Sequence, residues 1–198
     1  MTNDNNNIKD EDSLQYLMKL NPDKNIIVWI NENHDIFGNA RSIDEIWGIV
    51  FENNKLTYFE SENGSNGLDL PYVFGELKHL KKLYLSYTII RNDIPKWISN
   101  LQKLEFIYLA DNLLSGPIPT EFGKLKRLEE LYCSKNNLSG SIPTEFSKLE
   151  NITRLMFNDN ELTGNVPTEL LDIMNNEHNV IIKLDNNKFE KGFLEKKR

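Results

Sequence analysis

Five prolines recur along this 198-residue chain at a constant interval. Each proline follows an aliphatic residue and lies 24 residues after the preceding one, in the steps Leu70-Pro71, Ile94-Pro95, Ile118-Pro119, Ile142-Pro143 and Val166-Pro167. Self-similarity at a period of about 20–50 residues is typical of proteins built from stacked copies of one unit. The period therefore predicts a solenoid, in which each copy buries its apolar face only against its neighbours.

The copies also share apolar positions between the prolines. The segment from Leu101 to Ile118 is repeated, with substitutions, from Leu125 to Ile142 and from Leu149 to Val166, and the consensus is LxxLxxLxLxxNxLxGxIP. This pattern resembles the leucine-rich repeat. Its LxGxIP ending resembles the plant-specific subclass found in receptor-kinase ectodomains and polygalacturonase inhibitors.

The resemblance implies an α/β solenoid, a right-handed superhelix of about five to six repeats with a parallel β-sheet on its concave face and an N-terminal helical cap. Side chains alternate along a strand. The two apolar residues of each LxL segment are therefore expected to point inward, and the residue between them to point outward.

Four segments are predicted along the chain. Residues 1–10 are polar and are expected to be disordered, residues 11–55 form the N-terminal cap, residues 56–190 hold the repeats, and residues 191–198 are a mixed-charge tail. The cap is expected to contain a short amphipathic helix over residues 13–20. It resembles the cap of the plant family through Trp29 and the segment from Trp47 to Phe51, but it lacks that family's cysteines.

An asparagine recurs where each strand of the consensus ends. A short carboxamide there can both donate and accept hydrogen bonds to the backbone of the turn. Stacked once per repeat, these residues are predicted to form a structural ladder of Asn112, Asn136, Asn160 and Asn187.

The only cysteine, Cys133, occupies an inward LxL position and is expected to be a buried small hydrophobe. Residues 1–7 have neither the basic start nor the apolar stretch of a secretory signal. Together with the missing cysteine pairs, this favours a cytoplasmic location. Export without a cleavable signal remains open.

The charge of the chain limits the kinds of partner. It has 23 basic and 30 acidic residues, a net charge of −7 and no evident basic stripe, which argues against nucleic acid and against an anionic membrane. No apolar run is long enough to span a bilayer. The three histidines do not converge, and no nucleophile motif or phosphate-binding glycine loop is present. We expect a non-catalytic protein without a metal or cofactor.

The outward residues of the strands fall into columns that run across the sheet. One column is predicted to contain Glu60, Tyr84, Tyr108, Tyr132, Met156 and Lys183, and the column before it Tyr58, Lys82, Phe106, Glu130, Arg154 and Ile181. Aromatic residues bordered by charges are typical of protein-interaction hot spots. The predicted partner-binding residues are Lys82, Tyr84, Tyr87, Phe106, Tyr108, Asp111, Glu130, Tyr132, Arg154 and Met156.

These features favour a monomeric module that binds a protein or peptide on its concave face. An alternative interpretation of the tyrosines is that they only stack on one another and stiffen the sheet. Two other functions stay open: an inhibitor or recognition protein that acts on a secreted enzyme or a glycan, and a structural scaffold that associates with itself.

Overall fold

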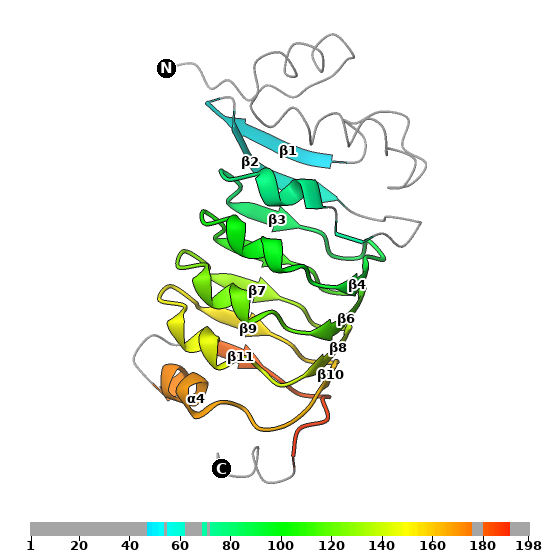
Figure 1. Cartoon of the computed structure of the whole chain (residues 1–198), viewed down its shortest axis with the longest axis vertical. Coiled ribbons are helices and arrows are strands. Elements are labelled where there is room, and N and C mark those ends of the chain that lie inside the picture. The colour runs from blue at the N-terminus through cyan, green and yellow to red at the C-terminus, as the bar shows by residue number, and fades with distance from the viewer. Residues whose placement is uncertain (1–46, 54, 62–68, 71, 176–179, 191–198) are drawn as a thin grey trace.

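The computed structural model describes residues 47–53, 55–61, 69–70, 72–175 and 180–190. These residues form a stack of coils, each contributing a strand to one long sheet, as the 24-residue period predicts (Figure 1). The predicted disordered segment, the helix over residues 13–20, Trp29 and the tail lie outside the described residues.

The main sheet, which corresponds to the predicted concave sheet, has seven strands in the order β1-β2-β3-β5-β7-β9-β11. β1 pairs antiparallel with β2, whereas all later pairs are parallel. The described end of the predicted cap is thus a β-hairpin. The strands are β1 (Trp47–Glu52), β2 (Lys55–Ser61), β3 (Lys82–Tyr84), β5 (Phe106–Tyr108), β7 (Glu130–Tyr132), β9 (Arg154–Met156) and β11 (Ile181–Lys183).

A second parallel sheet follows the asparagine turns and was not anticipated from the consensus. Its strands β4 (Arg91–Asp93), β6 (Leu113–Pro117), β8 (Asn137–Gly140) and β10 (Glu161–Leu162) lie in the order β10-β8-β6-β4. Gly116, Gly140 and Gly164 have φ values of 67°, 73° and 73°, a region that favours glycine. In the divergent repeat, Asn92 takes the same position with a φ of 64°.

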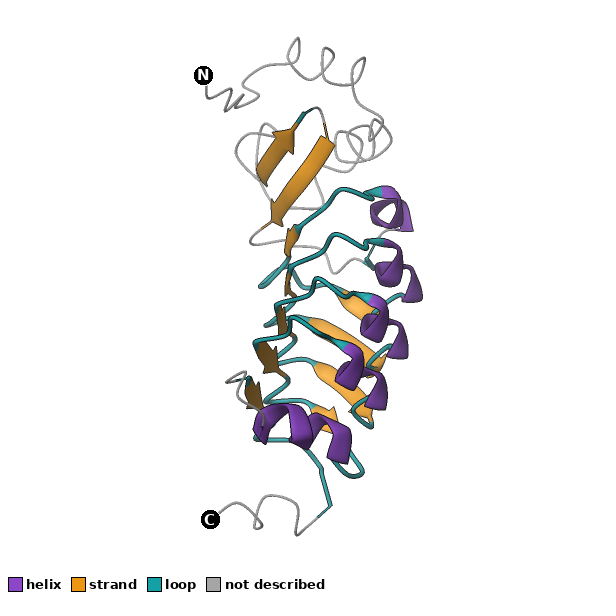
Figure 2. Ribbon diagram, turned by 90° about the vertical axis from the view of Figure 1, so that its left-hand side faces the viewer, coloured by secondary structure: helices purple, strands orange, loops and turns teal. Residues whose placement is uncertain are grey.

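Short helices occupy the opposite side of the stack from the main sheet (Figure 2). Three of them begin directly after a consensus proline, which is in extended conformation. Proline is tolerated there because the start of a helix does not need its missing amide hydrogen. The 3₁₀ helices are η2 (Tyr72–Glu76), η3 (Lys96–Asn100), η4 (Thr120–Lys124) and η5 (Thr144–Lys148), followed by the longer α4 (Thr168–Asn175). The final repeat contains the sequence insertion between Leu155 and Ile182, and its helix α4 is longer than the 3₁₀ helices of the other repeats.

The core lies between the sheets and the helices. The predicted inward pairs are buried in every repeat from Leu83 and Leu85 to Leu155 and Phe157, and the helices add Phe74, Phe122 and Phe146. Alternation along the strands is thereby confirmed.

Cys133 is fully buried within this core, as predicted, and burial raises the pKa of its thiol. A thiol with a raised pKa remains protonated and unreactive at neutral pH.

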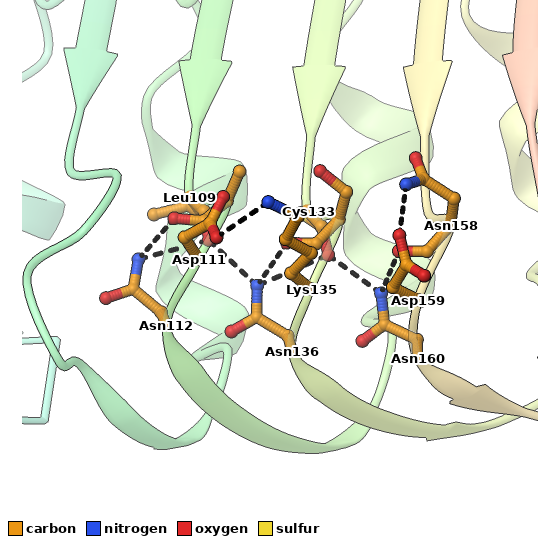
Figure 3. A network of polar contacts seen from close by, with 11 residues as sticks. Leu109, Asp111, Asn112, Cys133, Lys135, Asn136, Asn158, Asp159 and Asn160 are labelled. Carbon is orange, nitrogen blue, oxygen red and sulfur yellow. Dashed lines mark hydrogen bonds and ion pairs between the residues drawn. The ribbon is translucent and has the colours of Figure 1, made fainter. Parts of the chain in front are cut away.

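The strand ends are held by the asparagines of the consensus (Figure 3). Asn136 donates from Nδ2 to the Leu109 carbonyl of the preceding repeat at 2.9 Å, and its Oδ1 accepts from the Leu114 amide at 3.0 Å. Asn112, Asn160 and Asn187 bond to the preceding repeat in the same way. In the divergent repeat, Thr88 donates its hydroxyl hydrogen to the Leu85 carbonyl at 2.8 Å. Each asparagine turn is therefore tied to the one before it.

Candidate functional site

The outer face of the main sheet carries a row of stacked tyrosines. Strand register places Tyr84 beside Tyr108, and Tyr108 beside Tyr132, as the sequence predicts. The ring centroids of Tyr84 and Tyr108 are 4.3 Å apart with planes 9° from parallel, and those of Tyr108 and Tyr132 are 4.5 Å apart at 12°. We call Tyr58, Tyr84, Tyr108 and Tyr132 the tyrosine ladder.

Tyr58 extends this row and was not among the predicted partner-binding residues. Its ring lies 5.3 Å from that of Tyr84, tilted by 32°, and its hydroxyl donates to the Glu60 carboxylate. The sequence placed Tyr58 in the neighbouring column. A tyrosine side chain is long enough to contact a residue in the next column of the adjacent strand. The diagonal placement of Tyr58 and Tyr84 in the sequence could therefore have predicted this contact.

Stacking decides which parts of the ladder remain accessible. The rings of Tyr84 and Tyr108 each have another tyrosine on both sides, whereas Tyr132 has Met156 as its next neighbour in register. The side chains are half-buried as a result. Ring edges and hydroxyl groups, not ring faces, are therefore what the ladder offers to a partner.

Glu130 lies in the column beside the ladder and is nearly buried, with 9% of the residue exposed. Its carboxylate accepts a hydrogen bond from the Tyr108 hydroxyl and forms an ion pair with the Arg154 guanidinium. The hydrogen bond and the ion pair together offset the free-energy cost of burying the Glu130 charge. In the same column, the Lys82 ammonium lies 4.9 Å from the centre of the Phe106 ring, within cation–π range.

The hydroxyls of Tyr84, Tyr108 and Tyr132 are held in their neutral form. Burial is the main cause that raises the pKa values of Tyr84, Tyr108 and Tyr132, and the negative Glu130 carboxylate raises them further. For Tyr108, the hydrogen bond to Glu130 is the second largest cause. Neutral phenols can donate as well as accept hydrogen bonds.

A polar row lies where the strands end, beside the ladder. Lys135 Nζ is 3.1 Å from the Asp111 carboxylate, and the hydrogen bond between them is the main cause that raises the pKa of Lys135. Hydrogen bonds from Asn186 and Asn158 lower the pKa of Asp159. Tyr87 stands at the start of this row with 59% of its surface exposed and a φ of 60°.

The structure thus brings the ten predicted partner-binding residues to one surface. Lys82, Phe106, Glu130 and Arg154 form one column, and Tyr84, Tyr108, Tyr132 and Met156 the next. Tyr87 and Asp111 follow on the strand-end row, where each donates its amide to the next repeat.

The described residues contain no group of three or more His, Cys, Asp or Glu side chains suited to a metal ion. Within the same residues, no helix combines the length and apolar character needed to cross a bilayer.

Comparison with known proteins supports the repeat assignment. The family model described as Leucine Rich Repeat matches residues 79–101, 103–125 and 127–149. No curated protein sequence matches the chain.

Several solved structures are similar. The ectodomain of the Arabidopsis receptor kinase HAESA, in complex with the peptide hormone ligand IDA, is 32% identical over 68% of this chain and 22% of its own, with a TM-score of 0.62. The plant peptide hormone receptor RGFR1, in complex with RGF2, is 27% identical over 66% of this chain and 20% of its own, with a TM-score of 0.61. A plant ice-binding protein is 27% identical over 84% of this chain and 56% of its own, with a TM-score of 0.67.

This chain spans about a fifth of the length of the two receptors. Both are receptors, so the cytoplasmic location expected from the sequence gains no support from them and stays a prediction. The repeat matches, the parallel sheet and the similarity to receptor ectodomains agree on one assignment. The chain is a leucine-rich-repeat protein of the plant type.

Proposed function

We propose that this protein is a non-catalytic interaction module that binds an extended protein or peptide segment on the tyrosine ladder. One observation carries the proposal: the in-register stack of Tyr84, Tyr108 and Tyr132 on the outer face of the main sheet. Rigid rings with few rotatable bonds lose little entropy on binding, which is why tyrosine is frequent at hot spots.

The geometry of the stack favours a peptide over a glycan. Glycan recognition by aromatic side chains uses open ring faces, whereas the faces of Tyr84 and Tyr108 are covered by neighbouring rings. The phenol oxygens can still accept hydrogen bonds from the amide groups of an extended backbone, which has no partners of its own.

The charges beside the ladder are already satisfied within the protein. Arg154 pairs with Glu130, Lys82 lies over Phe106, and Glu60 accepts from Tyr58. A partner on this face is therefore selected by hydrogen bonds and apolar contacts more than by its net charge.

The similar structures support the same class of ligand. HAESA was solved in complex with the peptide hormone ligand IDA, and RGFR1, a plant peptide hormone receptor, in complex with RGF2. The identity of the partner and the face that it uses are, for this chain, part of the proposal.

The tyrosines also stack closely enough to serve only as a stiffener of the sheet. The test must therefore separate partner binding from this structural role. Peptides selected from a random display library on the intact protein would be titrated against Tyr132→Phe, which keeps the ring and removes only the hydroxyl. We expect weakening of about fivefold to tenfold, the equivalent of one hydrogen bond. The control is Tyr72→Phe, because Tyr72 lies on η2 and is 77% exposed.

A second variant, Tyr108→Ala/Tyr132→Ala, removes the centre of the ladder and should abolish binding. Circular dichroism would verify that the fold persists. Unchanged affinity in both ladder variants would reject the ladder as the binding site and leave stiffening as its role.

A further inference from the structure

A rim of the solenoid lies where the strands of the main sheet begin. It consists of residues 100–105, 124–129 and 148–153, which lead from the 3₁₀ helices into β5, β7 and β9. Lys126 Nζ donates to the Lys148 carbonyl at 2.6 Å, and Asn151 Nδ2 donates to the Lys126 carbonyl at 2.7 Å. The Glu129 amide donates to the Glu105 carbonyl at 2.8 Å. The three turns are therefore adjacent, and we call them the strand-start rim.

Basic side chains without partners gather on this rim. Elsewhere in the described chain, most cations are engaged: Lys81 with Glu52, Arg91 with Asp69, Lys96 with Glu121, Lys135 with Asp111, Arg154 with Glu130 and Lys188 with Glu161. The cations that have no hydrogen-bond, ion-pair or cation–π partner among the described residues are Lys55, Lys103, Lys124, Arg127, Lys148 and Lys183. All but Lys55 and Lys183 belong to the strand-start rim.

The 24-residue period explains the gathering. Lys103 and Arg127 occupy equivalent positions in successive repeats, as do Lys124 and Lys148. Residues that are separated in the sequence thus become neighbours across the stack. This local gathering of cations is not evident in the linear sequence, which predicts no basic stripe.

The rim reverses the charge of the molecule locally. The whole chain carries a net charge of −7, yet the rim holds Lys103, Lys124, Lys126, Arg127 and Lys148 against Glu105, Glu129 and Glu150. Lys124, Arg127 and Lys148 are exposed. Unpaired, exposed cations on a rigid frame can meet a partner without first breaking an internal ion pair.

We propose that the strand-start rim binds an acidic protein segment, at a site distinct from the tyrosine ladder. The rim carboxylates argue for this class of partner. Glu105, Glu129 and Glu150 lie among the cations and would repel a nucleic acid, whose charge is continuous along its backbone, or an anionic bilayer. A peptide with spaced carboxylates can meet the cations one by one and leave room for the rim glutamates.

The test uses a fluorescent peptide of about ten residues in which glutamate alternates with serine, titrated by anisotropy against the full chain at low salt and again at about 0.5 M salt. We expect saturable binding that salt weakens strongly. The rim variant Lys124→Gln/Arg127→Gln should bind at least fivefold more weakly, and addition of Lys103→Gln and Lys148→Gln should bring the loss to about tenfold or more.

The matched control is Lys183→Gln/Lys188→Gln, which removes the same charge from β11 and the residues after it and should bind within twofold of the intact protein. Equal losses in the rim and control variants would show a net-charge effect and overturn the proposal. Absence of binding by the intact protein would also overturn it, as would tighter binding of a thymidine oligonucleotide or of phosphatidylserine vesicles. Every variant keeps the tyrosine ladder, so this result is independent of the proposed peptide site.

Discussion

The Tyr108 hydroxyl on β5 donates a hydrogen bond to the Glu130 carboxylate on β7, one repeat further along the stack. Glu130 stands on the outer face of the sheet but is nearly buried, so this bond is shielded by the neighbouring side chains. It links the ladder column to the column that holds Phe106 and Arg154. The orientation of the central tyrosine is thereby fixed before any partner arrives.

Removal of this acceptor should destabilise the protein. Glu130→Ala leaves the Tyr108 hydroxyl without its acceptor, and we expect the free energy of unfolding to fall by about 1–3 kcal/mol. Glu130→Gln retains an acceptor oxygen and should cost about half as much. Urea denaturation of both variants would measure the difference, and a Glu130→Ala variant as stable as the intact protein would refute the role of this contact.

The asparagine ladder should be sensitive at Asn136 and insensitive one residue later. Asn136 is buried and bonds to the backbone of the preceding repeat, whereas Asn137 is exposed. We expect Asn136→Ala to lower the free energy of unfolding by about 1–3 kcal/mol, since buried backbone groups lose their partner. Asn137→Ala is the control and should change it by less than about 0.5 kcal/mol. Equal effects in thermal and urea denaturation would contradict this assignment.

Two glycines at equivalent helix positions should differ in their tolerance of a methyl group. A Cβ atom on Gly123 would lie 2.5 Å from the backbone carbonyl oxygen of Glu145, whereas one on Gly75 would meet only the Trp97 side chain at 3.2 Å. A backbone carbonyl in a packed stack cannot move aside as a side chain can. Gly123→Ala should therefore destabilise by about 1–3 kcal/mol and Gly75→Ala by clearly less. The reverse order in melting temperatures would be inconsistent with this packing.

The tyrosine ladder should make stability depend on pH in alkaline solution. The folded-state pKa values of Tyr84, Tyr108 and Tyr132 are raised above the ordinary value of 10.0, chiefly by burial. Stability from the neutral phenols is therefore fully present below pH 10 and is lost as the pH rises through the raised values.

Denaturation between about pH 8 and pH 11 should show this loss in the intact protein and a smaller loss in Tyr108→Phe. The variant cannot ionise at the position that is coupled most strongly to Glu130. Parallel curves for the two proteins would contradict the raised pKa of Tyr108.

The sequence alone predicted the repeat and the strand register because both follow from one period. Once Pro95 and Pro119 were aligned, the stacking of Tyr84 on Tyr108 and the burial of Cys133 followed from alternation along short strands. The first repeat, whose Ser61 departs from the consensus, still brings Tyr58 into register with Lys82.

Other features depend on how neighbouring repeats meet and could not be derived from one repeat. The second sheet arises because the chain continues in extended form after Asn112, a choice that the consensus does not specify. Glu130 stands at an outward position, yet its residue is nearly buried because the longer Tyr108 and Arg154 side chains enclose it. The strand-start rim likewise appears only when the repeats are stacked.

Photocrosslinking tests the proposed binding face most directly. A benzophenone side chain would replace Met156, which lies beside Tyr132, and in a second protein it would replace the exposed Tyr72 on η2. A display-selected peptide would then be irradiated with each protein. The account predicts a crosslinked peptide from position 156 and none from position 72. Crosslinking from position 72 alone, with binding intact in both proteins, would contradict it.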